Sequence, residues 1–461
     1  MSGNLLSRLT DAVGSDNVLT PDQLPAPAWE THQPFLGEYV VCPTTAEAVA
    51  KVVRTCADAG RAVVPMSGLT NLVQGCATQA TDIGLSMVRL NTIHEVDPVA
   101  QTMTADAGVT LRDAQAAAEL KGLLFPVDIG ARDNCMLGGN VSTNAGGTKV
   151  IRYGMTRDSV LGLEAVLADG TVVSSMNRYI KNNSGFDLKH LFIGTEGTLG
   201  VITQIVFRLR EAPASHNVAL VSLERYEDVL DTLQLVRSQL GASLCGFEVM
   251  WRSFYSKAKE ALAERGVTPA LPDDAPFFVI IEAMGADSKG DDQRFEAVLQ
   301  ALFEGGQVAD GVIAKSVAER EAIWAVRHEV EWLVRDAYNF DVSLRIADVG
   351  PYVERVTAGI SAEWPDAFVA AFGHLGDNNV HISVLAPDDR GGEGVSRHIY
   401  ESLVPYQGAI SAEHGIGLEK RPFLGLSRTT EEIALMGALK RFMDPKNTLN
   451  PGKVIEIAHG E

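Results

Sequence analysis

The spacing of hydrophobic and polar positions changes at about residue 210 of the chain. From about Val40 to Leu209, short apolar runs rich in β-branched residues alternate with helical patterns and clusters of glycine. Beyond them, apolar positions recur at helical spacing over long stretches, such as residues 224–241 and 316–337, between strands such as 276–285. The chain closes with one further helical pattern, a proline and an extended tail. These patterns predict a mixed chain of helices and strands in at least two parts.

Composition and charge narrow the class of protein. With 461 residues the chain exceeds one compact core, so we expect two or three domains. The net charge of −20 argues against a nucleic-acid partner, because such proteins need a basic face to neutralise phosphates. Five scattered cysteines without a CxxC pair favour a reducing compartment, and no apolar run approaches the ~18 residues of a membrane span. We therefore expect a cytoplasmic protein without an integral membrane segment; peripheral binding to the inner membrane stays open.

Three glycine-rich stretches in the first half call for one explanation. They cover residues 65–75, 136–154 and 192–203, and each is rich in small hydroxyl or amide side chains. Because glycine lets backbone amides approach an anion, such loops can hold a pyrophosphate. The dinucleotide fingerprint GxGxxG at a strand–helix junction and the phosphate loop GxxxxGK[ST] are both missing. The stretches predict a nucleotide held on neither a Rossmann fold nor a P-loop.

Two histidines flank a turn in the second half. His374 and His381 lie seven positions apart in GHLGDNNVHISV, where the GDNN residues favour a turn and the following residues alternate like a strand. A metal site would explain them, and so would two structural histidines in a core, because two ligands do not define a site. His94, His216 and His459 lie in plain polar contexts, where we expect solvated side chains.

Six motifs stand in an order found in one protein family. They are PMSGLTNLVQG; FPVDIG with LGGNVSTNAGG and RYG; DLKHLFIGTEGTLGVIT; GHLGDNNVHI; ISAEHGIG; and DPKNTLNPGK. Through them the chain resembles, over nearly its whole length, the FAD-linked oxidases and dehydrogenases of the vanillyl-alcohol oxidase type, which carry a PCMH-type FAD domain. Within that family it is similar to the branch acting on D-2-hydroxy acids, which includes D-2-hydroxyglutarate dehydrogenases, flavin D-lactate dehydrogenases and the glycolate oxidase large subunit.

The resemblance implies an α+β fold and a place for the cofactor. A two-part FAD-binding domain would cover residues 1–212, a cap domain with an antiparallel sheet flanked by helices would cover 213–424, and residues 425–461 would return to the first domain. FAD would be held non-covalently, because the pyrophosphate loop has no histidine or cysteine before Cys76. The implied FAD-binding residues are Pro65, Ser67, Gly68, Leu69, Thr70 and Asn71 at the pyrophosphate; Gly139, Asn140, Ser142, Asn144 and Gly147 along the flavin; Glu196, Gly197, Gly200 and Ile202 at the adenine and ribose; and Asn450 at the isoalloxazine.

The same resemblance implies a metal beside the flavin. His374, His381 and Glu413 match the branch's ligand positions, and two imidazoles with one carboxylate suit Zn²⁺, or another divalent metal, with an open coordination position. A 2-hydroxy acid would bind there, and the metal would stabilise the developing alkoxide. His414 resembles the general base that takes the hydroxyl proton while hydride passes from C2 to flavin N5.

Substrate choice is where the chain departs from the D-2-hydroxyglutarate enzymes. Arg327 matches the arginine that grips the distal carboxylate, but Glu331 replaces a threonine, Asn339 a lysine and Ser383 an asparagine. Arg345 replaces a proline. If its segment is a strand, Arg345 shares a face with Asn339 and could substitute for the missing lysine. Otherwise Arg327 pairs with Glu331 at i,i+4, which leaves a pocket for a monocarboxylate such as D-lactate.

The electron acceptor and the rival functions follow from what the sequence lacks. Without CxxC, haem or ferredoxin motifs, electrons would leave to a separate partner, such as an electron-transfer flavoprotein or a quinone or cytochrome; a homodimer is compatible with this. One alternative is the FAD subunit of a glycolate-oxidase-like complex. An alkyl-dihydroxyacetone-phosphate synthase would need a basic phosphate cluster and a histidine run, and neither is found. A non-enzymatic flavin scaffold would not explain the histidines and Glu413.

Overall fold

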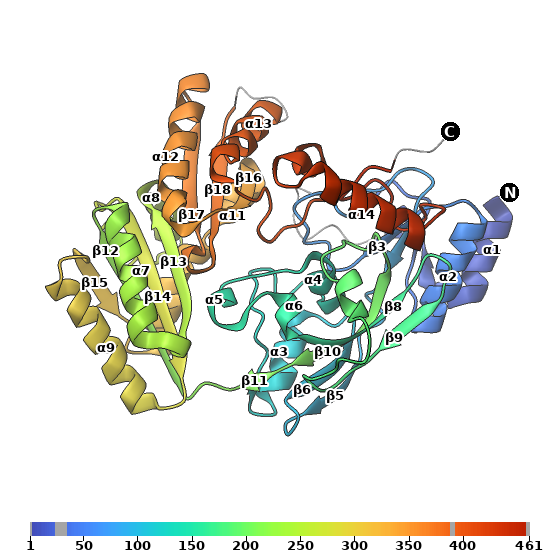
Figure 1. Ribbon diagram of the computed structural model, residues 1–461, viewed down its shortest axis with the longest axis horizontal. Helices are drawn as coiled ribbons and strands as arrows, with labels where there is room; N and C mark the ends of the chain where they lie inside the picture. The colour runs from blue at the N-terminus through green and yellow to red at the C-terminus, as the bar shows by residue number, and fades with distance from the viewer. Residues whose placement is uncertain (1, 24–34, 388–391, 458–461) are drawn as a thin grey trace. The chain divides into compact units, whose positions relative to one another are not determined.

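The computed structural model describes residues 2–23, 35–387 and 392–457 of the chain (Figure 1). It divides into two compact units. Unit 1 comprises Met1–Gly146, Met155–Ala212 and Glu413–Glu461, and unit 2 comprises Gly147–Gly154 and Pro213–Ala412. The second boundary therefore lies at Ala412, whereas the sequence had placed it at residue 424. The sequence did not predict that residues 147–154 belong to unit 2, because their glycine-flanked pattern does not indicate which unit they join.

Unit 1 contains two main sheets. In the first, β2, β4 and β3 are parallel and β1 pairs antiparallel with β2. The second is antiparallel throughout, in the order β5-β6-β10-β8-β9. The strands are β1 (Val18–Leu19), β2 (Tyr39–Val41), β3 (Val63–Met66), β4 (Ile83–Ser86), β5 (Ile93–Asp97), β6 (Thr102–Asp106), β8 (Val160–Val166), β9 (Val172–Ser175) and β10 (Val201–Arg208), with a separate pair β7 (Leu123–Leu124) and β11 (Arg210–Glu211).

The helices of unit 1 share one apolar core with these sheets. They are α1 (Ser2–Val13), α2 (Ala46–Asp58), α3 (Leu111–Glu119), α4 (Leu137–Thr143) and α14 (Thr430–Met443), whereas the short polar helix α6 (Thr156–Ser159) belongs to unit 1 without adding a residue to this core. Helix α2 begins where the Thr45 hydroxyl accepts a hydrogen bond from the Ala48 amide at 3.1 Å, and it buries Val49, Val52 and Val53. The core thus joins segments from the start and the middle of the chain.

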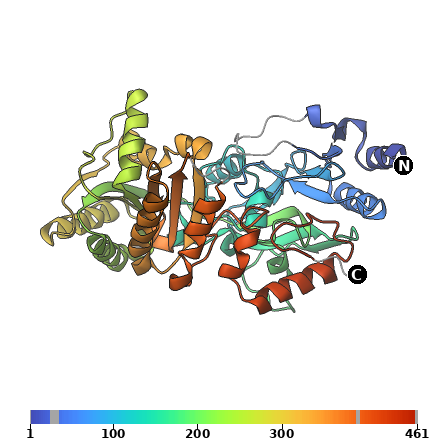
Figure 2. The same ribbon diagram turned by 90° about the horizontal axis from the view of Figure 1, so that it is seen from above.

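The C-terminal tail completes unit 1, as Figure 2 shows for the red helix α14 beside the blue and green elements. The Lys440 ammonium group donates to the carbonyl of Thr198 at 2.9 Å and of Leu449 at 2.6 Å, and it pairs with Asp444. Beyond the helix, the Asn450 amide donates to the Val63 carbonyl at 2.8 Å. The expected helix and proline stop are therefore present, but the tail after them is not extended, because residues 445–455 form turns and bends with positive φ at Asn447, Asn450 and Gly452.

Unit 2 is built on one seven-stranded antiparallel sheet, ordered β15-β12-β14-β13-β17-β18-β16, with helices on both faces (Figure 1). The antiparallel sheet flanked by helices is thereby confirmed. The strands are β12 (Ser215–Leu223), β13 (Leu244–Trp251), β14 (Phe277–Gly285), β15 (Asp310–Ile313), β16 (Tyr338–Ser343), β17 (Phe368–Gly373) and β18 (Asn379–Leu385). The helices are α5 (Val150–Tyr153), α7 (Tyr226–Leu240), α8 (Arg252–Glu264), α9 (Ser288–Glu304), α10 (Val317–His328), α11 (Glu331–Asp336), α12 (Ile346–Glu363) and α13 (Glu393–Glu401).

Two predicted elements of unit 2 end earlier than their patterns indicate. The long helix expected at 316–337 is broken into α10 and α11 at Glu329, whose carboxylate accepts from Arg265 at 2.9 Å and whose carbonyl accepts from the Trp332 indole at 3.2 Å. The strand expected to continue to Ile346 ends at Ser343, because Arg345 already occupies the cap position of α12. Apolar spacing alone does not reveal these competing polar contacts.

Candidate functional site

The turn between β17 and β18 holds both imidazoles of GHLGDNNVHISV. Asn378 adopts a left-handed conformation with φ of 76°, and the Asn379 amide returns to the His374 carbonyl at 3.2 Å. The chain then reverses, so that His381 lies opposite Phe372 across the two strands. The two imidazole rings stand nearly perpendicular with centroids 5.2 Å apart. A tight polar turn thus brings together residues seven positions apart.

Glu413 completes a group that can hold a metal. Ligand atoms of His374, His381 and Glu413 all lie within 4.8 Å of one another. Glu413 directly follows Ala412, whose amide donates to the Asp341 carboxylate at 3.1 Å. Within unit 1, a Cβ on Gly146 would lie 2.6 Å from the Glu413 carboxylate, so a glycine leaves room for this side chain. Two imidazoles and a carboxylate are a donor set that fits Zn²⁺ and other divalent transition metals.

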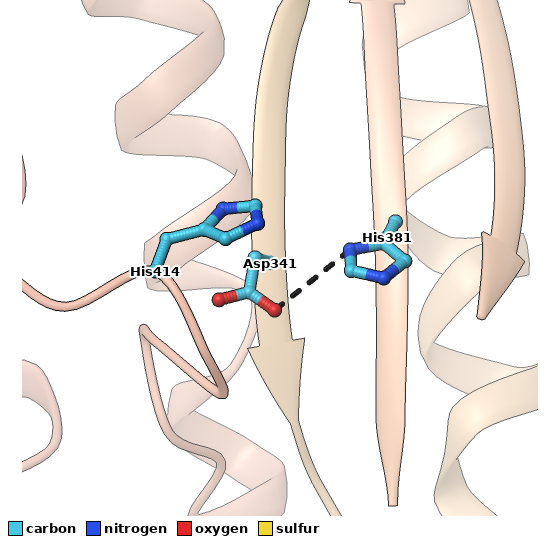
Figure 3. A group of neighbouring side chains, drawn as sticks. All are labelled: Asp341, His381 and His414. Atoms are coloured by element: carbon cyan, nitrogen blue, oxygen red, sulfur yellow. Dashed lines mark ion pairs between the residues drawn. The ribbon is translucent and has the colours of Figure 1, made fainter. Parts of the chain in front are cut away.

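Asp341 belongs to a second, overlapping group that the sequence did not indicate. Ligand atoms of Asp341, His381 and His414 also lie within 4.8 Å of one another, and Figure 3 shows the carboxylate between the two rings. Asp341 is fully buried on β16 opposite His381, with a carboxylate oxygen 3.8 Å from the His381 Nδ1 atom. Within the sheet, the side-chain amide of Asn379 also donates to the Asp341 carboxylate at 2.8 Å. An aspartate between the apolar residues Phe340 and Val342 was the available signal.

Glu248 is a second buried carboxylate that the sequence missed. It lies on β13 and accepts from His374 Nδ1 at 2.5 Å and from Arg327 Nε at 2.8 Å. Burial would raise the pKa of Glu248, but His374 and Arg327 together lower it to about 2. The Arg327 guanidinium also lies 4.5 Å from the centre of the Phe372 ring. A charged residue inside the apolar run LCGFEVMW could have marked this position.

The candidate substrate residues are only partly brought together. Asn339 and Ser383 lie opposite each other on β16 and β18, and the Ser383 hydroxyl donates to the side-chain oxygen Oδ1 of Asn339 at 2.6 Å. The suggested Arg327–Glu331 pair is wrong, because Arg327 pairs with Glu248 while Glu331 pairs with Arg265. The shared face of Arg345 and Asn339 is also wrong. With the strand ending before it, Arg345 is 81% exposed and pairs with Asp348 at 2.6 Å.

The glycine-rich loops of unit 1 retain buried polar atoms suited to a cofactor. Among the described residues, the Ser67 hydroxyl and the Asn450 carbonyl oxygen are buried without a hydrogen-bond partner. Asn71 shapes the first loop by accepting from the amides of Val73 and Gly75, both at 2.9 Å. A Cβ on Gly139 would lie 2.7 Å from the Ser67 hydroxyl. The loops therefore fit a hydrogen-bonding ligand such as FAD, because their small residues leave room for the ligand to approach the backbone.

The other implied FAD residues line the same loops or the elements that carry them. Helix α4 carries Gly139, Asn140 and Ser142 and ends at Asn144 in a left-handed conformation. Ile202 is buried in β10 directly after Gly200 and Val201. Among the implied FAD residues, positive φ occurs at Leu69, Asn144, Gly147, Glu196, Gly197 and Asn450, and Gly147 belongs to unit 2. Pro65 lies in β3, and Gly68 and Thr70 lie in the loop after it.

Glu196 has a partner that the resemblance did not imply. Its buried carboxylate accepts from the backbone amides of Ile416 at 2.6 Å and Gly417 at 2.9 Å, which lie two and three residues after His414. Burial raises the pKa of Glu196, and these two amides and Lys420 partly offset the effect. Its backbone carbonyl accepts from the Asn450 side chain at 2.8 Å. In unit 1 Glu196 thus supports the segment that carries Glu413 and His414.

A further charged cluster lies on the sheet of unit 2. Glu282 on β14 is buried and pairs with both Lys149 and His216. His216, whose side chain is 34% exposed, is therefore only partly solvated, and His459 lies outside the described residues. Burial would raise the pKa of Glu282, but Lys149 and His216 lower it to about 2. Lys149 also lies 5.0 Å above the Trp324 ring. The cluster holds the inserted segment 147–154 against the sheet.

Comparison with known proteins agrees with this architecture. Residues 37–175 match the family described as FAD binding domain, and residues 212–454 match FAD linked oxidases, C-terminal domain. Over 426 residues the chain is 37% identical to a D-2-hydroxyglutarate dehydrogenase of Xanthomonas citri pv. viticola, covering 90% of this chain and 89% of that one. Over 468 residues it is 32% identical to a D-2-hydroxyglutarate–pyruvate transhydrogenase of Saccharomyces cerevisiae, covering 98% and 94%.

The fold is shared with a structure from a more distant protein. The chain superposes on p-cresol methylhydroxylase with substrate bound, with a TM-score of 0.80 at 17% identity, covering 100% of this chain and 98% of that one. Within the part of the chain that the structure describes, no helix combines the length and apolar character needed to cross a membrane. The chain therefore belongs to the FAD-linked oxidases, of the vanillyl-alcohol oxidase type indicated by its motifs, and is an FAD-dependent oxidoreductase.

Proposed function

We propose that the chain oxidises a D-2-hydroxy acid to the 2-oxo acid, using non-covalent FAD and a bound divalent metal such as Zn²⁺. The observation that carries the proposal is the convergence of His374, His381 and Glu413, with His414 next to the carboxylate ligand. The names of the relatives, which include D-2-hydroxyglutarate dehydrogenase, support the substrate class. The loop at residues 65–75 has no histidine or cysteine to which flavin could be attached, which supports dissociable FAD.

The proposed roles follow from the chemistry of each side chain. His374, His381 and Glu413 would hold the metal, and the FAD loops with Ser67 and Asn450 would hold the flavin. When bound, the metal supplies a Lewis acid for the substrate hydroxyl, and FAD supplies the acceptor of the hydride from C2. His414 would take the hydroxyl proton, since an imidazole is a suitable base near neutral pH.

Two observations point to different substrates within this class. The relatives named D-2-hydroxyglutarate dehydrogenase favour a dicarboxylate. Against this, the charge of Arg327 is already balanced by Glu248, and Arg345 points to solvent beside Asp348. With no further cation supplied by Arg345, the pocket suits a single carboxylate, as in D-lactate or a longer neutral hydroxy acid. Both substrates therefore belong in one assay.

The electron acceptor that we propose is a separate protein or quinone. We expect the enzyme in the cytoplasm. The sequence has no second redox motif to carry electrons onward, which supports an external acceptor such as an electron-transfer flavoprotein. Dye reduction under air, compared with the yield of hydrogen peroxide, distinguishes this route from oxidase chemistry. A stoichiometric peroxide yield would contradict it.

The visible spectrum of the purified protein tests the function directly. We expect a yellow protein whose flavin absorbance bleaches on adding D-2-hydroxy acids, including D-2-hydroxyglutarate and D-lactate, but not their L-enantiomers. A chelator should prevent the bleaching, and added Zn²⁺ should restore it. A colourless protein, or equally fast bleaching after complete metal removal, would contradict the proposal.

A further inference from the structure

We infer that Glu248 is a positioning residue that fixes the candidate metal ligand His374 and the candidate substrate arginine Arg327 through one shared carboxylate. The inference rests on the proposed function for the roles of these two partners. It assigns a task to a residue that lies outside the six sequence motifs. All three residues belong to unit 2.

The sheet register places Glu248 behind His374. Met250 lies opposite Phe372 across β13 and β17, and Val249 lies opposite Gly373. Because the strands are antiparallel, the next residues along them, Glu248 and His374, come to lie opposite each other. The Glu248 side chain is almost completely buried, and its two oxygens are divided between the partners. One oxygen accepts from His374 Nδ1 at 2.5 Å and the other from Arg327 Nε at 2.8 Å.

This arrangement determines which nitrogen of His374 can bind a metal. A carboxylate that accepts from Nδ1 keeps the proton on that nitrogen, so the lone pair is left on Nε2. Such a carboxylate also fixes the ring orientation and makes the imidazole a better ligand. The Nε2 atom lies 3.5 Å from Arg327 Nη2. Without the Glu248 charge, the guanidinium would stand uncompensated beside the position of a divalent cation, which would weaken metal binding.

Replacing Glu248 by glutamine removes the negative charge and one acceptor oxygen but keeps the packing of the side chain. A glutamine amide has nearly the same volume, but it presents one oxygen and one NH₂ group. It can accept from His374 or from Arg327, and it then directs a donor at the other partner. An aspartate keeps both oxygens on a shorter side chain. Glu248→Asp should therefore recover part of what Glu248→Gln loses.

The chain offers a matched control in Glu282. This glutamate is equally buried on the neighbouring strand β14 and lies opposite Gly246, two residues before Glu248, on the same face of the sheet. Its partners are Lys149 and His216 instead of the site residues. A loss that came only from disturbing a buried ion pair in this sheet would appear in Glu282→Gln as well.

The test measures zinc affinity without turnover. The dissociation constant for Zn²⁺ would be obtained by competition with a chromogenic chelator, for the FAD-loaded wild type and for Glu248→Gln, Glu248→Asp, Glu282→Gln and His374→Ala. We expect His374→Ala to abolish the site and Glu248→Gln to weaken it about 10- to 100-fold. Glu248→Asp should lie between, and Glu282→Gln should stay close to the wild type.

The outcomes separate the inference from the proposed function. If Glu248→Gln binds Zn²⁺ as tightly as Glu282→Gln does, the inference is overturned even where the wild type is an active dehydrogenase. If the expected affinities are found but no 2-hydroxy acid bleaches the flavin, the positioning role stands and the substrate proposal falls. Zinc binding by His374→Ala equal to that of the wild type would overturn the inference too. If Glu248→Gln fails to fold, unchanged zinc affinity in Glu248→Asp would overturn it, and weakened affinity would support it.

Discussion

Two buried carboxylates on neighbouring strands of the same sheet have similar electrostatics and different tasks. Glu248 and Glu282 are both inaccessible to solvent, each has two basic partners, and in each the partners outweigh burial and lower the pKa to about 2. The partners differ, however. Glu248 holds His374 and Arg327, whereas Glu282 holds Lys149 of the inserted segment and His216. A perturbed pKa in a buried pair therefore does not identify a functional residue until its partners are known.

The largest effect is expected at the candidate active site, and not at the Glu282 cluster. Replacing His414 by glutamine removes the proposed base, so kcat should fall by about 10²- to 10⁴-fold. Zinc affinity and flavin content should stay at the wild-type level, which separates this loss from a loss of the metal. Steady-state dye reduction with the best D-2-hydroxy acid measures the effect. Wild-type turnover in this variant would exclude His414 as the base.

The Glu282 side of the comparison should govern stability. Glu282→Gln leaves Lys149 and His216 beside a neutral amide, and breaking such a buried pair should lower the free energy of unfolding by about 3 kcal/mol. Denaturant unfolding at pH 7 measures this cost, and Lys257→Gln, which disturbs an exposed pair, provides the control. Turnover per folded flavin-loaded enzyme should hardly change. A stable Glu282→Gln protein that has lost turnover would reverse the assignment of the two clusters.

The stability contributed by Glu282 should also depend on pH. Its pKa is lowered from 4.5 to about 2 on folding, so the contribution is complete above pH 4.5 and disappears as the pH falls towards 2. The difference in unfolding free energy between wild type and Glu282→Gln should therefore shrink between pH 5 and pH 3, at the acidic end of this range. Parallel denaturant titrations across the range provide the measurement. A constant difference would show that the ionised carboxylate is not the source of stability.

The smallest effect is expected at Arg345. Because this side chain is mostly exposed and pairs only with Asp348 in the described structure, Arg345→Ala should change kcat/KM for D-2-hydroxyglutarate and for D-lactate by less than about twofold. Arg327→Lys provides the contrast, since it keeps a charge but cannot span Glu248 in the same way. A selective loss on the dicarboxylate in Arg345→Ala would restore the carboxylate-binding role suggested by the sequence.

Local sequence was sufficient for the parts of the site that local structure creates. The GDNN turn between β17 and β18 explains why His374 and His381 could be paired from the sequence alone, and the ordered motifs were sufficient to identify the family. Asp341 and Glu248 could not be found in this way, since the register of four strands brings them to the histidines. Arg345 was misplaced for the converse reason, because its alternating pattern continues past the residue where the strand ends.

The division of the chain into units has a consequence for its synthesis on the ribosome. Unit 1 is closed by residues 413–461, whose Asn450 amide pairs with the Val63 carbonyl at the edge of a parallel sheet. All of residues 213–412 are translated between these two partners. The second unit can therefore finish folding during translation, whereas the nascent first unit waits with an incomplete sheet edge until residues 413–461 emerge.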